Sequence, residues 1–267
     1  MALHEQIAAV DRVLQNACVP GVVAAVTDRD DTLYMGAAGR RAHQGGAAMT
    51  PDTVLALFSA SKPMVATAGL QLVQQGRLTL DTPVKNYVPE IDDLQVLVGF
   101  DASGQPQLRP PRRPVTVRML FQHTAGFSYD FLNSNYRRLV KAHGYAPAMA
   151  SNRACLRMPL LSDPGETWCY GLSTDWLGLV IEAVTGQLLQ ATLQAQIFDP
   201  LGMVSTGFVP TPSMSERLAV VHRRKGDELR SLPAPQGEPE VQMGGQGLYS
   251  TAEDYIRFIR AWLNDGR

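Results

Sequence analysis

The sequence predicts an α/β (α+β) fold in which an antiparallel sheet flanked by helices is joined to a mainly helical domain. Two observations support this class. Short strand-like segments bounded by turn residues lie near both ends of the chain, and segments with helical periodicity fill its middle. We therefore expect residues 1–58 and 200–267 to form the α/β domain, and residues 59–199 to form the helical domain.

The N-terminal segment predicts a helix followed by a hairpin. Residues 1–14 place apolar side chains at helical spacing, and Pro20-Gly21 separates them from the next segment. Two apolar segments, residues 22–27 and 33–36, flank the polar turn Asp28-Arg-Asp-Asp31. This arrangement is typical of a β-hairpin.

The middle of the chain predicts helices that end at glycine and proline stops. Residues 58–76 indicate the end of a strand, a turn and then a helix that stops at Gly76. Further helices are expected over residues 116–122, 174–184 and 188–197, and residues 100–104 are expected to form a small loop.

The C-terminal segment predicts a second hairpin and a final helix. Residues 220–232 carry the turn Lys225-Gly-Asp near their centre. The last helix is expected to begin at Thr251, where Asp254 forms an imperfect capping box, and to end at Gly266.

The motif with the most chemical information is Ser59-Ala-Ser-Lys62, at the expected start of a helix. Residues three apart share one face of a helix, so Lys62 can reach the Ser59 hydroxyl. The helix dipole disfavours an ammonium at this end, and an uncharged amine can activate serine, which is otherwise a weak nucleophile. Serine and lysine also occur at this spacing by chance, so the weight of the motif depends on the segments that accompany it.

Further segments accompany this motif in a consistent order. They are Leu70–Pro89, Val115–Phe127 with its His123-Thr-Ala-Gly turn, Pro164–Tyr170, Phe198–Met203 and Gly244–Tyr255. With them, the chain resembles the serine β-lactamase-like superfamily, which includes class C β-lactamases, D-Ala-D-Ala peptidases and carboxylesterases. The resemblance implies a β-lactamase/transpeptidase-like fold with Ser59, Lys62 and Tyr170 as catalytic residues, and it implies no metal and no cofactor.

The second motif of that superfamily is Tyr-x-Asn, and this chain departs from it. Leu172 stands at the position of the asparagine, which helps hold the substrate amide in β-lactamases and peptidases. The segments Tyr170–Gly178 and His123–Phe131 instead resemble the family VIII carboxylesterases. The resemblance implies that Leu172 and Ser173 contact the substrate.

Members of the superfamily continue beyond the segment that is similar to Leu263-Asn-Asp-Gly266. Their continuation carries a third motif (K-T-G, H-x-G or W-x-G) on a strand that lends a backbone N–H to the oxyanion hole. Nothing in this sequence matches that motif. We therefore expect the sheet to be incomplete, as in a piece of a longer protein, and to be completed by a C-terminal companion segment or in a homo-oligomer.

Composition argues against several classes of function. The formal net charge of −1 gives no reason to expect nucleic acid or an anionic membrane as a partner, and no apolar run is long enough to span a membrane. The three cysteines and five histidines show no metal-binding spacing. The N-terminal segment does not have the pattern of a signal peptide, so we expect a cytoplasmic protein.

Together these features predict a serine ester hydrolase, a carboxylesterase, that takes short-chain acyl esters as small-molecule substrates and forms an acyl-enzyme. Ser59 attacks the acyl carbon while Lys62 and Tyr170 share the proton transfers, and which of the two is the base stays open. Two alternatives also stay open: a β-lactamase or D-Ala-D-Ala peptidase of the same fold, and a non-catalytic binding protein. We expect His123 to be structural, and Asp175 to cap a helix or form a salt bridge.

Overall fold

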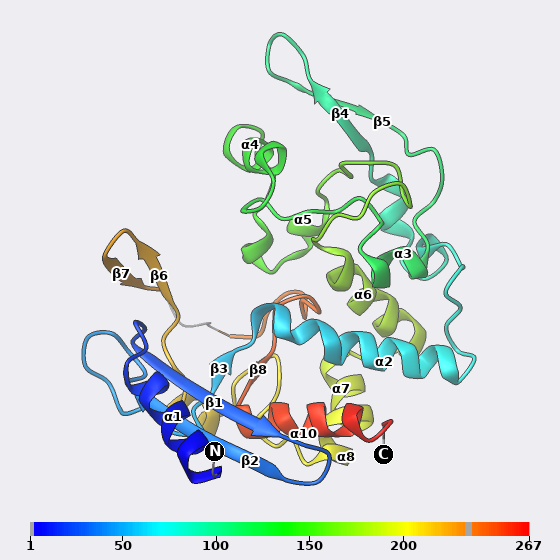
Figure 1. The fold of residues 1–267 in the computed structure, drawn as a ribbon. Coiled ribbons are helices and arrows are strands. Elements are labelled where there is room, and N and C mark those ends of the chain that lie inside the picture. Colours follow the sequence, from blue (N-terminus) through cyan, green and yellow to red (C-terminus); the bar gives the residue numbers. More distant parts are fainter. Residues whose placement is uncertain (1–2, 233–236, 267) are drawn as a thin grey trace. The chain divides into compact units, whose positions relative to one another are not determined.

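The computed structural model describes residues 3–232 and 237–266 and divides the chain into two compact units (Figure 1). Unit 1 comprises Met1–Leu57, Gln194–Glu238 and Leu248–Arg267, and unit 2 comprises Phe58–Leu193 and Pro239–Gly247. The short segment 239–247 therefore packs with the part of the chain that carries Ser59 and Lys62.

Unit 1 is built around a hairpin of β1 (Gly21–Thr27) and β2 (Thr32–Gly39), which pair antiparallel. The turn is fixed by Asp28, whose Oδ1 accepts hydrogen bonds from the backbone N–H groups of Asp30 (2.9 Å) and Asp31 (2.7 Å). The hairpin predicted from the polar turn is therefore confirmed.

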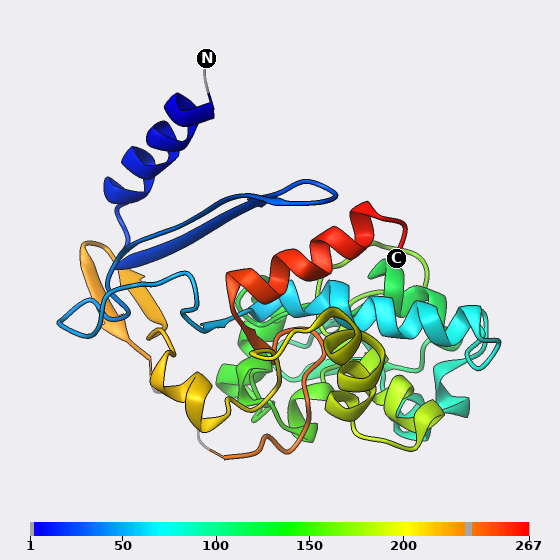
Figure 2. The same ribbon diagram turned by 90° about the horizontal axis from the view of Figure 1, so that it is seen from below.

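Two helices pack against this hairpin (Figure 2). α1 (Leu3–Gln15) contacts β2, and α10 (Ala252–Leu263) contacts β1. α10 begins after Thr251, as predicted, because the Thr251 hydroxyl accepts a hydrogen bond from the Asp254 N–H at 3.2 Å. The second half of a capping box is not formed, since the buried Asp254 carboxylate accepts from the Ser205 N–H at 2.7 Å instead.

The remaining elements of unit 1 are short. They are β3 (Leu55–Ala56), α8 (Asp199–Leu201), α9 (Pro212–Glu216), β6 (His222–Lys225), β7 (Glu228–Ser231) and β8 (Tyr249–Ser250). β6 and β7 form the predicted second hairpin, and β3 pairs with β8. In the described part of the chain each sheet has two antiparallel strands, so the predicted antiparallel pairing is confirmed and the sheets are small.

α6 (Ser173–Thr185) forms the centre of unit 2 and is buried along most of its length. α2 (Lys62–Gln74), α3 (Val117–Gln122) and α7 (Leu189–Leu193) all pack against it (Figure 1). The fully buried apolar side chains of this core include Met64, Leu72, Trp176, Leu177 and Ile181. Each contributes about 1.5–3 kcal/mol by leaving water, which gives the N-terminal ends of α2 and α6 a rigid support.

Two parts of the chain differ from the sequence-based prediction in their type of structure. The loop expected at residues 100–104 is the tip of a hairpin formed by β4 (Val96–Phe100) and β5 (Pro106–Arg109). The helix expected over residues 188–197 is α7, which continues into a π-helical turn over Gln194–Phe198.

Two short helices of unit 2 were not predicted. α4 (Ser134–Ala142) and α5 (Arg153–Leu156) each follow an asparagine, Asn133 and Asn152, whose side chain accepts hydrogen bonds from the first backbone N–H groups of the helix. Elements this short show too few apolar repeats to be recognised by periodicity, and the capping residue is the signal that could have found them.

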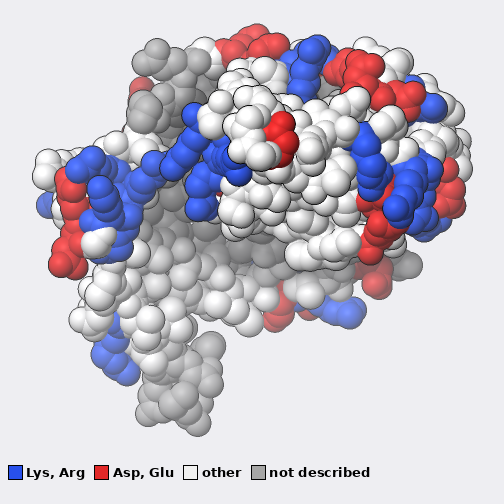
Figure 3. All heavy atoms as spheres, turned by 90° about the horizontal axis from the view of Figure 1, so that it is seen from above, with Lys and Arg blue, Asp and Glu red and all other residues white. Residues whose placement is uncertain are grey.

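Charged residues of both signs lie interspersed on the face seen in Figure 3, in keeping with the formal net charge of −1. Over the described ranges, no single helix is long and apolar enough to cross a membrane. One bent pair of helices, Ser173–Thr185 with Leu189–Leu201, meets that test by length and composition only.

Candidate active site

Ser59 lies in a tight turn directly before α2. Residues Phe58–Ser61 form a 3₁₀ turn, and Phe58 has a φ of 47°, in the left-handed region that is uncommon for an aromatic residue. Pro63 follows in the first turn of α2, where its missing N–H costs no internal hydrogen bond. The turn leaves Ser59 exposed, so that its hydroxyl can meet a substrate.

Lys62 places its amine beside Ser59. Its Nζ lies 3.2 Å from the Ser59 Oγ and 3.2 Å from the Tyr129 hydroxyl, and it donates to the Gly245 carbonyl at 2.8 Å. The first of these contacts confirms the prediction that Lys62 reaches Ser59. Only the carbonyl among the three partners is obliged to accept a hydrogen bond. An uncharged amine that donates to Gly245 and Tyr129 can therefore accept the Ser59 proton.

Tyr129 belongs to this cluster, although sequence reasoning did not single it out. Its side chain is buried, and the one signal for it was its place in the segment His123–Phe131. Burial raises the pKa of the Tyr129 hydroxyl well above its ordinary value, and the neighbouring Asp175 and Tyr170 raise it further. Tyr129 is therefore a neutral phenol, which can accept a hydrogen bond from Lys62 and donate its own proton to another group.

Tyr170 meets the Lys62 amine with the face of its ring. The Nζ lies 4.6 Å from the ring centroid, and within the described residues the Tyr170 hydroxyl forms no hydrogen bond to Lys62 or Ser59. The ring packs against those of His123 and Trp168, with centroids 4.8 Å and 6.3 Å away. The structure thus brings Tyr170 to the site, while the proton-transfer role of its hydroxyl stays a prediction.

A close backbone contact holds the two tyrosines together. Gly171 lies directly against Ser128, and a Cβ atom at position 171 would come within 2.4 Å of the Ser128 Cα. Only glycine allows this approach. Ser128 precedes Tyr129 and Gly171 follows Tyr170 in the chain, so this contact brings the two tyrosines together. Their ring centroids lie 5.7 Å apart.

Leu172 and Ser173 lie in the protein interior. Their exposed fractions are 1% and 0%, and they form the start of α6. The structure therefore brings neither side chain to the exposed surface around Ser59, and their predicted contact with substrate has no support in this geometry.

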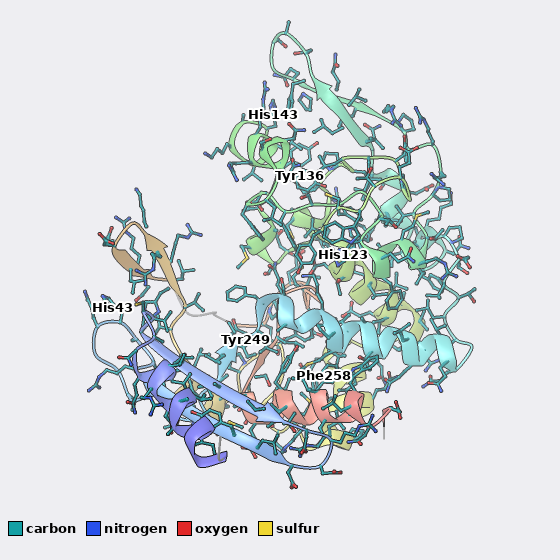
Figure 4. All side chains as sticks on the ribbon, in the orientation of Figure 1. His43, His123, Tyr136, His143, Tyr249 and Phe258 are labelled. Atoms are coloured by element: carbon teal, nitrogen blue, oxygen red, sulfur yellow. The ribbon has the colours of Figure 1, made fainter. Side chains whose placement is uncertain are left out.

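His123 ends α3 in a left-handed conformation with a φ of 57°, and Figure 4 marks its side chain in unit 2. Burial, and then the charge of Lys62, lower the pKa of His123 to about 4, so the imidazole is neutral at pH 7. Its ring packs on Tyr170. A neutral, packed imidazole fits the structural role expected for it.

Two residues complete the cluster from distant parts of the sequence. The N–H of Gly245, whose carbonyl binds Lys62, donates to the Asp175 Oδ1 at 2.7 Å. Asp175 lies in the first turn of α6 and is fully buried. The expected helix cap or salt bridge is therefore replaced by a hydrogen bond to another segment. Sequence reasoning missed it because it joins residues 70 positions apart.

Aromatic rings continue from this cluster to the surface. Phe131 stacks on Tyr129 with centroids 5.0 Å apart, and Trp168 stacks on Tyr170. The exposed fractions of Phe131 and Trp168 are 52% and 65%. We call Trp168, Tyr170, Tyr129 and Phe131 the aromatic row. It offers apolar surface next to the Lys62 amine.

The chain is similar to esterases and acyltransferases. It is 34% identical to lovastatin esterase of Penicillium rubens, over 93% of this chain and 65% of that protein. It is also 34% identical to acyltransferase mokF of Monascus pilosus, over 82% of this chain and 55% of that protein.

A solved structure, the LovD6 mutant of simvastatin synthase from Aspergillus terreus, matches with a TM-score of 0.82 at 29% identity, over 99% of this chain and 68% of that one. The chain thus spans 55–68% of the length of these three relatives. Its fold is the β-lactamase/transpeptidase-like fold that the resemblance implied. The family model described as Beta-lactamase matches residues 7–267, and the chain therefore belongs to the beta-lactamase family.

Proposed function

We propose that the protein is a serine ester hydrolase that works through an acyl-enzyme, with Ser59 as the nucleophile. The observation that carries the proposal is the 3.2 Å contact between the Ser59 Oγ and the Lys62 Nζ. An exposed hydroxyl beside an amine is the arrangement that nucleophilic catalysis requires. The similarity to an esterase gives further support.

In the first half of the reaction, the Ser59 oxygen bonds to the carbonyl carbon of the ester while its proton passes to Lys62. The Ser59 N–H supplies one hydrogen bond to the oxyanion. The tetrahedral intermediate then expels the alkoxide, which takes up the proton and leaves as an alcohol, and the acyl group stays on Ser59. In the second half, water adds to the acyl carbon and loses a proton through the same groups, which releases the acid and restores the Ser59 hydroxyl.

We assign the proton transfers to Lys62, Tyr129 and Tyr170 as one unit. Lys62 is the group within reach of Ser59, and Tyr129 holds the Lys62 amine in place. Tyr170 is less buried than Tyr129 and is therefore the phenol that an alcohol can approach. In this proposal the Tyr170 hydroxyl delivers the proton to the leaving alcohol.

The substrates that we propose are short-chain acyl esters with an apolar alcohol part. The aromatic row supports this choice, because exposed rings gain free energy when an apolar group covers them. Trp168 is the most exposed ring of the row and offers the largest contact to such a group.

The test uses p-nitrophenyl butyrate as the ester. Ser59→Ala should lose on the order of 10⁴–10⁶-fold in turnover, because the covalent route disappears. The variant should also lose labelling by a fluorophosphonate probe. If the variant keeps more than a tenth of the activity, the assignment of Ser59 is wrong. A folded wild-type protein that the probe does not label would favour the non-catalytic binding protein.

Nitrocefin in a parallel assay separates the esterase from a β-lactamase of the same fold. The buried Leu172 offers no amide to hold a lactam substrate, so we expect the ester to be hydrolysed faster. Faster hydrolysis of nitrocefin would favour the β-lactamase.

Transfer of the acyl group to an alcohol is a second candidate function. Acyltransferase mokF is 34% identical to this chain, and the exposed aromatic row would bind an apolar alcohol in the place where water must otherwise attack. Hydrolysis and transfer use the same acyl-enzyme and differ only in the acceptor.

A further inference from the structure

Asp175 is a buried carboxylate that the reaction scheme above does not use. We propose that Asp175 is a positioning residue of the catalytic unit: it anchors Gly245 against Lys62, and its negative charge stabilises the ammonium that forms when Lys62 takes the Ser59 proton. The inference rests on the proposed function, in which Lys62 accepts that proton.

Gly245 joins Asp175 to Lys62 through its two backbone polar groups. The Asp175 Oδ1 accepts from the Gly245 N–H at 2.7 Å, and the Gly245 carbonyl accepts from the Lys62 Nζ at 2.8 Å. Gly245 is thus held at both of its backbone polar groups. A Cβ atom at position 245 would lie 2.7 Å from the Asp175 Oδ2, so the close contact requires glycine. With one donor of Lys62 fixed on this carbonyl, the amine has a defined orientation towards Ser59.

Asp175 places an ionisable carboxyl group in the protein interior. The Asp175 carboxylate is fully buried, and its hydrogen-bond partners in the described part of the chain, the Gly245 N–H and the Tyr129 hydroxyl, are both uncharged. A buried carboxylate that has only uncharged partners costs free energy, so a merely structural role does not explain it. A nearby cation explains the buried carboxylate, because the attraction between opposite charges is strong in a low-dielectric interior. Lys62 is that cation once it has taken the proton, and a fixed charge aimed at it lowers the barrier.

Three titratable side chains face the Asp175 carboxylate. They are Lys62 from α2, the Tyr129 hydroxyl and the Cys155 thiol from α5. Burial raises the pKa of Asp175 to about 6 and that of Cys155 to about 11, and it also raises the pKa of Tyr129. At pH 7 the thiol and the phenol are therefore neutral and Asp175 is ionised, so its charge acts on Lys62.

The experiment measures kcat/KM for p-nitrophenyl butyrate against pH in the wild type and in three variants of the full chain. Asp175→Asn keeps the shape and an oxygen for the Gly245 N–H but removes the charge. Gly245→Ala keeps the charge and disturbs the contact. The matched control is Asp163→Asn, a buried aspartate of unit 2 that also accepts from a backbone N–H, at 2.9 Å, but faces Arg109 rather than Lys62. Titration of the burst of nitrophenol normalises each rate to folded active sites.

We expect Asp175→Asn to lower the plateau by about 10–10²-fold and to lose the acid limb near pH 6, because in the wild type that limb marks the loss of the stabilising charge as the Asp175 carboxylate takes up a proton. Gly245→Ala should lower kcat with a smaller change in the acid limb. Asp163→Asn should leave the profile unchanged per active site.

A failure of the proposed function and a failure of the proposed role of Asp175 give different results. If the wild type shows neither a burst nor dependence on Ser59, the proposed function itself is wrong. If the wild type is active and depends on Ser59, but Asp175→Asn keeps its acid limb and a plateau within about twofold of the wild type, Asp175 has no part in positioning or charge stabilisation.

Discussion

At the scale of single residues, the candidate site is built from the contacts of the Lys62 amine. The Lys62 amine lies beside the Ser59 hydroxyl, donates to the Gly245 carbonyl and has two phenol rings packed against it. The two phenols differ in contact, because Tyr129 is hydrogen-bonded to the amine and Tyr170 presents its ring face. This difference predicts that their loss affects different steps of the reaction.

Two esters with different leaving groups can distinguish the role of Tyr170 from that of Tyr129. If Tyr170 delivers the proton to the departing alcohol, Tyr170→Phe should slow hydrolysis of an alkyl butyrate by about 10²–10⁴-fold but that of p-nitrophenyl butyrate far less, since nitrophenolate leaves without a proton. Tyr129→Phe removes the hydroxyl that is hydrogen-bonded to the Lys62 amine, so it should slow hydrolysis of both esters by a similar factor. Steady-state kcat/KM for the two esters measures each ratio.

Lys62→Ala provides the control for this assignment. Combined with Tyr170→Phe, it should cost far less than the product of the two single losses, because groups that act as a unit are not additive. Equal slowing of both esters by Tyr170→Phe, or strictly multiplicative losses in the double variant, would contradict the assigned role.

Asp175 also predicts how stability changes with pH. Its pKa of about 6 in the folded protein lies above the ordinary value of 3.8, so its contribution to stability is full below pH 3.8 and is lost as the pH rises through 6. Asparagine does not titrate. The stability of Asp175→Asn relative to the wild type should therefore rise between pH 4 and pH 7, by up to about 3 kcal/mol. Denaturant unfolding at the two pH values measures this change.

For the control, Asp163→Asn, the change in relative stability with pH has the opposite sign. The hydrogen-bonded Arg109 lowers the pKa of Asp163, so the stability from that pair is present at neutral pH and is lost as the pH falls. Asp163→Asn should therefore be least stable, relative to the wild type, at pH 7. A relative stability of Asp175→Asn that stays constant from pH 4 to pH 7 would show that Asp175 does not titrate in this range.

At the scale of elements, the site is assembled where backbone segments approach closely. Position 171 packs against the Ser128 backbone, and the segment that ends at Gly247 returns to the start of α2. These approaches are long-range contacts, and they set the distances between the side chains that neighbouring residues carry. A change of one methyl group at such a point is therefore expected to act on the whole cluster.

Gly171→Ala tests this expectation. The added Cβ would lie 2.4–2.6 Å from three backbone atoms of Ser128, which cannot move aside as a side chain can. We expect a loss of more than about 2 kcal/mol in the free energy of unfolding and reduced turnover per folded molecule, because Tyr170 moves away from Tyr129. Gly99→Ala is the matched control, since nothing lies within 4 Å of a Cβ at position 99 in β4. Equal stability of the two variants, measured by thermal unfolding, would refute the requirement for glycine at 171.

The elements that the sequence predicted well are those with local signals. The turn after Asp28, the cap at Thr251 and the stop of α2 before Gly76 each depend on a few neighbouring residues. The contact between Ser59 and Lys62 was predictable for the same reason, because both belong to one turn. The hydrogen bonds of Lys62 to Tyr129 and Gly245 span 67 and 183 positions, and no local pattern indicates which distant residue reaches an amine.

At the scale of the whole molecule, the proposed acyl-enzyme could pass its acyl group to either of two acceptors, water or an alcohol. The relatives include an esterase and an acyltransferase, and the chain spans 65% and 55% of their respective lengths. Water needs no binding surface, whereas an alcohol competes with concentrated water only when it is held near the acyl carbon. The aromatic row is the part of unit 2 that can hold an apolar alcohol, so transfer should depend on it more than hydrolysis does.

Butanol added to the p-nitrophenyl butyrate assay tests this dependence. We expect butyl butyrate to form alongside butyric acid, and Trp168→Ala to lower the ratio of ester to acid by about 3–10-fold, because the variant loses apolar contact with the alcohol. Release of nitrophenol in plain buffer should change little. Trp262→Ala is the matched control, since Trp262 is 56% exposed but lies in unit 1, outside the aromatic row. Chromatography of the two products gives the ratio. If no butyl ester forms at any butanol concentration, the protein is a hydrolase alone; if the ester forms but Trp168→Ala and Trp262→Ala leave the same ratio, the alcohol binds elsewhere.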